Sequence, residues 1–174
     1  MAERTVITDP MRAAVGRELS RSVSFPISRS DIRKWALAVY YPEEPPRLFW
    51  DEAYAATTVH GGIVAPEEFN PFGWMVAEPP GLPPPNEFRN DPDRTEKTLG
   101  IDGPGLKFQL NGGLEVDYGA RMRPGDQITA VTTLAGYRER EGRLGLMLFT
   151  SSESVWTNQK GEMVKRSAGT VIRY

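Results

Sequence analysis

The stretch from residue 28 to residue 41 constrains the fold more than any other part of the chain. Five apolar side chains recur there at the spacing of one helical face, namely Ile32, Trp35, Ala36, Val39 and Tyr40. Ser28 or Ser30 can cap the start of this helix, and Tyr41-Pro42 ends it, because the residue before a proline is pushed out of the helical region. A helix with such a face needs a large covering surface, which the strand-rich remainder of the chain has to supply.

The second half of the chain alternates between apolar and polar residues, as strands do. Turn sequences at 123–126, 139–142 and 158–161 divide this pattern. The predicted strands lie at 22–27, 114–118, 128–137, 144–156 and 163–172. Strands joined by short turns form an antiparallel meander. We therefore predict an α+β fold in which one antiparallel sheet wraps around one long central helix.

The remaining segments complete a single predicted domain that spans residues 1–174. Short helices are expected within 10–19, at 51–57 with Asp51 as the cap, and at 67–77. Residues 78–105 hold seven prolines interspersed with charges. Because a long loop in a compact domain is usually functional or disordered, we predict a loop insertion there that acts as a flap or faces an oligomer. It is not a domain linker, because neither flank would form a complete core without the other.

Composition narrows the classes of function. The chain has 174 residues with 21 Lys plus Arg against 23 Asp plus Glu, and this balance argues against a nucleic acid or an anionic membrane as partner. It contains no cysteine and one histidine, so thiol catalysis and a His-rich metal site are excluded, and we predict no metal. No apolar run approaches the ~20 residues of a membrane span, and the start of the chain lacks a secretory signal. We expect a cytoplasmic protein.

Four segments, taken in order, resemble one known family. They are the strand and helix at 24–40, Asp-Glu-Ala-Tyr-Ala at 51–55, Gly-Ile-Val-Ala-Pro at 62–66, and Asn-Gly-Gly-Leu-Glu-Val at 111–116 followed by Arg-Pro-Gly-Asp-Gln-Ile-Thr at 123–129. The set is similar to the N-terminal-type domain of MaoC-like dehydratases, also called the fatty-acid-synthase-type dehydratase domain. The resemblance implies a single hot-dog domain over nearly the whole chain after residue 10.

The resemblance also implies a reaction, the addition or removal of water at C2–C3 of an acyl thioester. Active members use the Asp and His of an Asp-x-Asn-Pro-x-His motif, placed after the long helix, as acid and base on one water. Here Glu44 stands at the Asp position, Pro46 and Arg47 at the Asn-Pro positions, and Phe49 at the His position. Phenylalanine cannot transfer a proton. The resemblance therefore implies a non-catalytic half of a 3-hydroxyacyl-thioester dehydratase, or enoyl-CoA hydratase, that shapes the acyl tunnel.

Two candidate catalytic residues remain, Glu44 and His60, although an exposed loop carboxylate and a loop histidine bonded to backbone are the ordinary alternatives. The candidate substrate-binding residues are Asn111, Gly112, Gly113, Gly62, Ala65, Phe49 and Trp50. The glycine pair at 112–113 could present backbone N–H groups to a thioester, or it could form a bulge in a strand. The aromatic residues could line a tunnel or pack in the core.

The expected partners are an acyl-CoA substrate, which itself carries coenzyme A so that no further cofactor is implied, and a second hot-dog unit. A homodimer and a heterodimer with a catalytic MaoC-type subunit both stay open, because either would cover the exposed edge of one sheet. Two other functions stay open as well. One is an acyl-CoA binding or scaffold module without activity, and the other is a hot-dog acyl-CoA thioesterase that uses Glu44 or Glu67.

Overall fold

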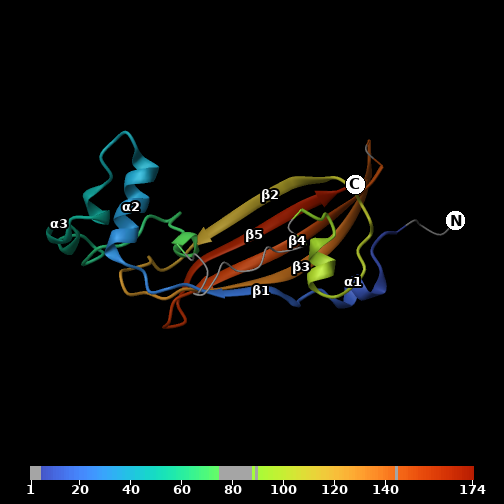
Figure 1. The fold of residues 1–174 in the computed structure, drawn as a ribbon, viewed down its shortest axis with the longest axis horizontal. Coiled ribbons are helices and arrows are strands. Elements are labelled where there is room, and N and C mark those ends of the chain that lie inside the picture. The colour runs from blue at the N-terminus through green and yellow to red at the C-terminus, as the bar shows by residue number, and fades with distance from the viewer. Residues whose placement is uncertain (1–4, 75–87, 89, 144) are drawn as a thin grey trace.

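The computed structural model describes residues 5–74, 88, 90–143 and 145–174. The described residues contain a five-stranded antiparallel sheet in the order β1-β3-β4-β5-β2 (Figure 1). Its strands are β1 (Glu18–Val23), β2 (Gln109–Tyr118), β3 (Thr129–Gly142), β4 (Gly145–Thr157) and β5 (Met163–Arg173). β3, β4 and β5 form a meander, while β1 pairs with β3 and β2 with β5. The predicted α+β class and antiparallel sheet are confirmed.

Several strand boundaries differ from the prediction: β1 starts at Glu18 rather than at residue 22, and β2 starts at Gln109 rather than at residue 114. The first strand ends at Val23 rather than at residue 27, because Pro26 has no N–H to continue a ladder. Ser24 and Ile27 instead donate backbone N–H bonds of 2.8 Å to the carbonyls of Ile128 and Asp126. β3 runs through the charged turn predicted at 139–142, and the hairpin reverses between Gly142 and Gly145.

The long predicted helix is present as α2 (Arg29–Tyr40). Ser28 caps it in a capping box, in which the Asp31 N–H donates to Ser28 Oγ at 3.1 Å and the Ser28 N–H donates to Asp31 Oδ2 at 3.3 Å. Ile32 and Ala36 have no exposed surface, as predicted. Val39 was expected on the same buried face but is 57% exposed.

Figure 1 explains this exposure, because α2 and α3 (Glu52–Ala56) lie at one end of the sheet rather than along its length. The core around α2 includes Ile128 and Val164, with Trp156 packed against it, all from that end of the strands. The sheet therefore packs against α2 only with residues at one end of its strands.

Two short helices, α1 (Asp9–Ala13) and α4 (Arg94–Thr98), lie at the other end of the sheet (Figure 1). Two small cores bury their apolar residues there, one with Ile7, Met11 and Leu148 and the other with Ala14, Leu99 and Leu134. α4 falls inside the predicted loop insertion at 78–105, so part of that segment is folded against the sheet; residues 78–87 and 89 lie outside the described residues.

The helix predicted at 67–77 is wrong for its described part, which contains only a 3-10 turn at Pro71–Trp74. Pro71 removes a donor from the interior of that segment and so interrupts an α-helix. Residues 75–77 lie outside the described residues. Across the described ranges, no helix combines the length and the apolar character that crossing a membrane requires.

Candidate functional site

The Arg123-Pro124-Gly125-Asp126 turn, which is one part of the resemblance, has a structural role. Gly125 has a φ of +89°, which favours glycine. Its N–H donates to the Ile27 carbonyl at 2.8 Å, and the Arg123 N–H donates to Asp126 Oδ2 at 2.8 Å. Gln159, in the turn between β4 and β5, donates its side-chain N–H to Asp126 Oδ1 at 3.0 Å. The turn thus ties the approach to α2 to the end of the sheet.

The two candidate catalytic residues lie on different segments, Glu44 on the connection after α2 and His60 on the loop after α3. Phe49 is 6% exposed and its ring centroid lies 6.0 Å from that of Tyr40, inside the core around α2. Glu44 is exposed on the connection before it. His60 is half-buried in a turn, where its backbone N–H donates to Thr58 Oγ1 at 3.3 Å. Among the described residues, no hydrogen bond joins Glu44 to His60. The catalytic role predicted for Glu44 and His60 therefore stays a prediction.

Glu44 and Trp50 do come together, at a shallow hollow of about 100 Å³ beside α2. Its lining consists of Arg33, Leu37, Glu44, Pro45 and Trp50. The Trp50 indole N–H is already used, since it donates to the Pro45 carbonyl at 3.0 Å. The predicted role of these residues in binding substrate stays a prediction.

Asp51 has the structural role predicted for it. Its carboxylate accepts the Tyr54 N–H at 3.0 Å and so caps α3. That backbone hydrogen bond, together with the Arg47 guanidinium 2.6 Å away, lowers the pKa of Asp51 below its usual range.

Gly62 and Ala65 lie on the loop that follows α3. Ala65 is 1% exposed and donates its N–H to the Met122 carbonyl at 2.8 Å, so it belongs to the core around α2. Gly62 is half-buried, and a Cβ there would have its nearest neighbour, Arg123 Nη1, at 4.0 Å. Nothing in these contacts requires a glycine for the approach of a ligand.

Asn111, Gly112 and Gly113 form a bulge on the edge strand β2, where the register with β5 shifts by one residue. Gly113 has a φ of +126°, and its N–H donates to Asn111 Oδ1 at 2.9 Å. A Cβ on Gly112 would lie 2.9 Å from Ile172 Cγ1. The bulge lies at the end of β2 that is away from α2 (Figure 1). The structure therefore separates these three residues from Glu44 and His60.

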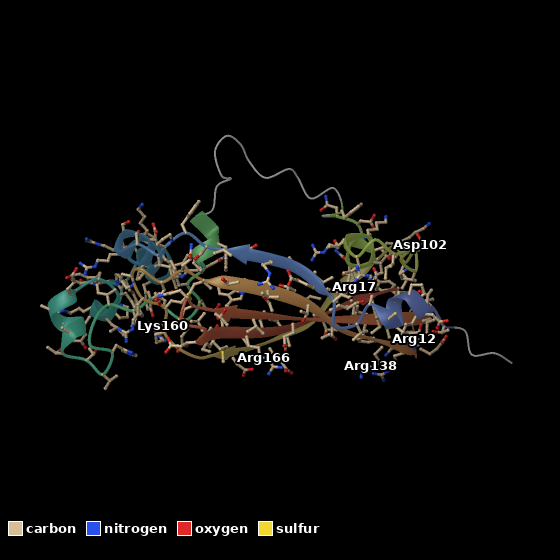
Figure 2. All side chains as sticks on the ribbon, turned by 90° about the horizontal axis from the view of Figure 1, so that it is seen from below. Arg12, Arg17, Asp102, Arg138, Lys160 and Arg166 are labelled. Carbon is tan, nitrogen blue, oxygen red and sulfur yellow. The ribbon has the colours of Figure 1, made fainter. Side chains whose placement is uncertain are left out.

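A cavity that the sequence reasoning missed lies between the sheet and α4, with a volume of about 300 Å³. We call the sheet face that carries Leu134, Thr150 and Arg173 the inner face, and the opposite face the outer face. The lining comes from the inner face, from α4 and from the residues before it: Leu19, Ser20, Pro92, Arg94, Thr95, Thr98, Gln109, Thr132, Thr150, Ser152, Val171 and Arg173. Figure 2 shows Arg17 on the side of the sheet that carries α4, with Arg138 and Arg166 on the other side.

The floor of this cavity is a buried network centred on Arg173, which is 1% exposed. Its guanidinium donates to both Glu96 oxygens at 2.7 and 2.8 Å and to Asp93 Oδ1 at 2.9 Å. It also donates to Thr150 Oγ1 at 2.8 Å and to the Pro92 carbonyl at 2.9 Å. These bonds fix the start of α4 to the C-terminal end of β5.

Tyr137 completes the network from β3, since its hydroxyl donates to Glu96 Oε1 at 2.7 Å. Burial, and then this hydrogen bond to a carboxylate, raise the pKa of Tyr137 far above its usual value. One sequence signal could have revealed the cavity: Thr132, Ser152 and Ser154 place hydroxyls at inward positions of the central strands, where a core would have apolar residues. Within the described ranges, no group of three or more His, Asp or Glu side chains is arranged to hold a metal ion.

The strand order, with the long helix between β1 and β2 in sequence, defines the chain as a hot-dog domain of the α+β class. Residues 13–167 match the family described as the FAS1-like dehydratase domain region, and the chain belongs to this family. Among curated protein sequences, none matches the chain significantly.

Solved structures with the same fold include MaoC-like dehydratases and hydratases. The MaoC-like dehydratase from Rhodospirillum rubrum is 21% identical, with 92% of both chains covered and a TM-score of 0.56. In the ChsH1-ChsH2 complex from Mycobacterium tuberculosis the match is 20% identical, covers 89% of this chain and 83% of the other, and has a TM-score of 0.65. In the HadBC complex (3R-hydroxyacyl-ACP dehydratase) from the same organism it is 17% identical, covers 91% and 99%, and has a TM-score of 0.54. The resemblance to MaoC-like dehydratases is confirmed, and at these identities the neighbours establish the fold.

Proposed function

We propose that this chain is the non-catalytic half of a heteromeric hydratase or dehydratase, which adds or removes water at C2–C3 of an acyl thioester carried on coenzyme A. One observation carries the proposal. At the position of the family's proton-transferring histidine the chain has Phe49, which is 6% exposed and packed in the core. Because phenylalanine cannot transfer a proton at this position, we place the acid and base of the reaction on another subunit.

The edge strand β2 supports assembly with such a subunit. It pairs with β5 on one side only, so its other backbone edge is unpaired within the described sheet. Leu110 is 49% exposed and Leu114 is 65% exposed on this strand. The ChsH1-ChsH2 and HadBC neighbours are both complexes, which supports a partner that differs from this chain.

Pairing two such sheets edge to edge has a geometric consequence. In β2, Tyr118 is at the α2 end of the sheet and Gln109 is at the α4 end (Figure 1). If a related subunit pairs with β2 in the antiparallel sense, about a two-fold axis, its own helical end lies next to Gln109. The partner's acid and base, which follow its long helix, would then lie near the α4 end of this chain.

The test is hydration of crotonyl-CoA, which is measured as the loss of absorbance of the enoyl thioester. We expect no turnover by this chain alone, and turnover when it is purified as a complex with a MaoC-type subunit that has an intact Asp-x-Asn-Pro-x-His motif. A complex in which the partner's motif histidine is replaced by glutamine is the matched control and should be inactive. Turnover by this chain alone would refute the proposal.

The other functions predict different outcomes. Binding of acyl-CoA with no hydration in any such complex would favour a scaffold. Release of free CoA, abolished by Glu44→Gln or Glu67→Gln, would favour a thioesterase.

A further inference from the structure

The cavity beside α4 is lined by hydrogen-bonding groups rather than by hydrocarbon. Ser20, Thr132 and Ser152 contribute hydroxyls from three adjacent strands, and Thr95 and Thr98 contribute two more from α4. Thr132 donates to Ser154 Oγ at 3.1 Å. The polar side chains of the lining that form no hydrogen bond with any described residue are Ser20, Arg94, Thr95, Thr98, Gln109 and Ser152.

Two charged side chains line the cavity, Arg94 and Arg173, and the carboxylates of Asp93 and Glu96 lie behind the lining, where they bind Arg173. Arg173 and the exposed Arg94 are positive, and Asp93 and Glu96 are negative, so the sum is zero. The two carboxylates are engaged by Arg173, and its bond to Thr150 Oγ1 leaves the Thr150 hydroxyl able to donate elsewhere. A ligand that matches these walls is neutral and both donates and accepts hydrogen bonds.

We propose that this cavity binds a neutral, hydrogen-bonding part of the thioester substrate, one that carries hydroxyl and amide or keto groups, and does not bind a hydrocarbon tail. This inference rests on the proposed function for its substrate class. An alkyl chain would remove the hydroxyls of Ser20, Thr132 and Ser152 from water without replacing their hydrogen bonds, and that loss makes a polar site reject an apolar ligand. A volume of about 300 Å³ is sufficient for a small organic group.

The position of the cavity fits this role. Ser152 is four residues along β4 from Trp156, which packs against the core around α2, a distance of about 13 Å in an extended strand. Gln109, at the start of β2, lines the cavity. Antiparallel pairing across β2 would bring the helical end of a partner to this same end. This chain would then hold one part of the substrate while the partner performs the proton transfers.

Two parts of an acyl-CoA have the required chemistry. The pantetheine arm carries two amides and a hydroxyl, and an oxygenated acyl group carries hydroxyl or keto groups. Calorimetric titration of the isolated chain distinguishes them, with D-pantetheine, hexanoyl-CoA and 6-hydroxyhexanoyl-CoA as the three probes. Binding of D-pantetheine with equal affinity for the two thioesters identifies the arm. No binding of D-pantetheine, with affinity at least threefold higher for the hydroxylated thioester, identifies the acyl group.

Thr132→Val and Ser152→Ala remove inward hydroxyls with little change of volume, and each should weaken binding of the preferred probe by about threefold to tenfold. Thr133→Val is the matched control, because Thr133 is adjacent in β3 but belongs to the outer face, where it pairs with Glu153. The control should bind as the unmodified chain does. Thermal melting of the three variants establishes that each is folded.

Three results would overturn the inference: no binding of any probe, tighter binding of hexanoyl-CoA than of its hydroxylated counterpart, or affinities unchanged by both inner-face variants. These results are independent of the proposed function, because the titration needs no partner and no turnover. An active complex whose isolated half binds no probe would retain the proposed function and refute only the cavity as a ligand site. An inactive complex whose isolated half binds D-pantetheine would retain the cavity as a ligand site and refute the proposed function.

Discussion

Replacing Arg173 by leucine tests the buried network most directly. The guanidinium forms five hydrogen bonds, and without it Glu96 and Asp93 lose their positive partner in the interior. Breaking a buried ion pair from one side costs about 3–5 kcal/mol of unfolding free energy. For a chain of this length that corresponds to a fall in melting temperature of about 6–20 °C. We expect Arg173→Leu to cost about 4 kcal/mol in urea unfolding.

The size of this effect depends on burial, and β5 offers a matched control. Arg166 lies on the same strand and pairs with Glu153, but its side chain is 52% exposed. Arg166→Leu should therefore cost less than about 1 kcal/mol. The double variant Arg173→Leu with Glu96→Leu should be more stable than Arg173→Leu alone, because it removes an unpaired buried carboxylate. A cost below 1 kcal/mol for Arg173→Leu, or strict additivity in the double variant, would refute the reasoning.

Two further predictions concern the same end of the sheet. The folded state raises the pKa of Tyr137, so the stability that its protonated phenol contributes is fully present below a pH of about 10 and is lost as the pH rises further. In urea unfolding, the free energy of unfolding should therefore decline less steeply with alkaline pH in Tyr137→Phe than in the unmodified chain. An equal decline in both proteins would contradict that. Gly112→Ala should cost about 1–3 kcal/mol, because its Cβ would lie 2.9 Å from Ile172 Cγ1, whereas Gly136→Ala, with nothing within 4 Å, should cost clearly less. Equal costs would show that the close approach at the bulge is not the reason for glycine.

The sequence predicted the elements whose signals are local. The cap at Ser28, the helix at α2, the cap at Asp51 and the strands β3 to β5 all follow from local signals, and the structure contains each of them, although Val39 is exposed. The position of α2 on the sheet is harder to predict from the sequence, because it depends on which part of the sheet is apolar. The inner face carries Ser152 and Thr132 in its middle, so the helix packs at the end, against Ile128 and Val164.

In the candidate site, too, local features are predictable from the sequence and long-range contacts are not. Absence of a proton carrier at Phe49 follows directly from the sequence, and its burial agrees with that interpretation. The network around Arg173 could not be predicted, because it joins Asp93 and Glu96 to a residue about 80 positions later. No spacing rule connects such residues before the sheet is assembled.

The Arg123–Asp126 turn has a consequence for how relatives of this chain are recognised. Its hydrogen bonds join the approach to α2 to the turn after β4, and none of them involves Glu44 or His60. A match to this tetrapeptide in another chain therefore indicates the same scaffold and carries no information about proton transfer. The residues after the long helix, where this chain has Phe49, are the ones that bear on proton transfer.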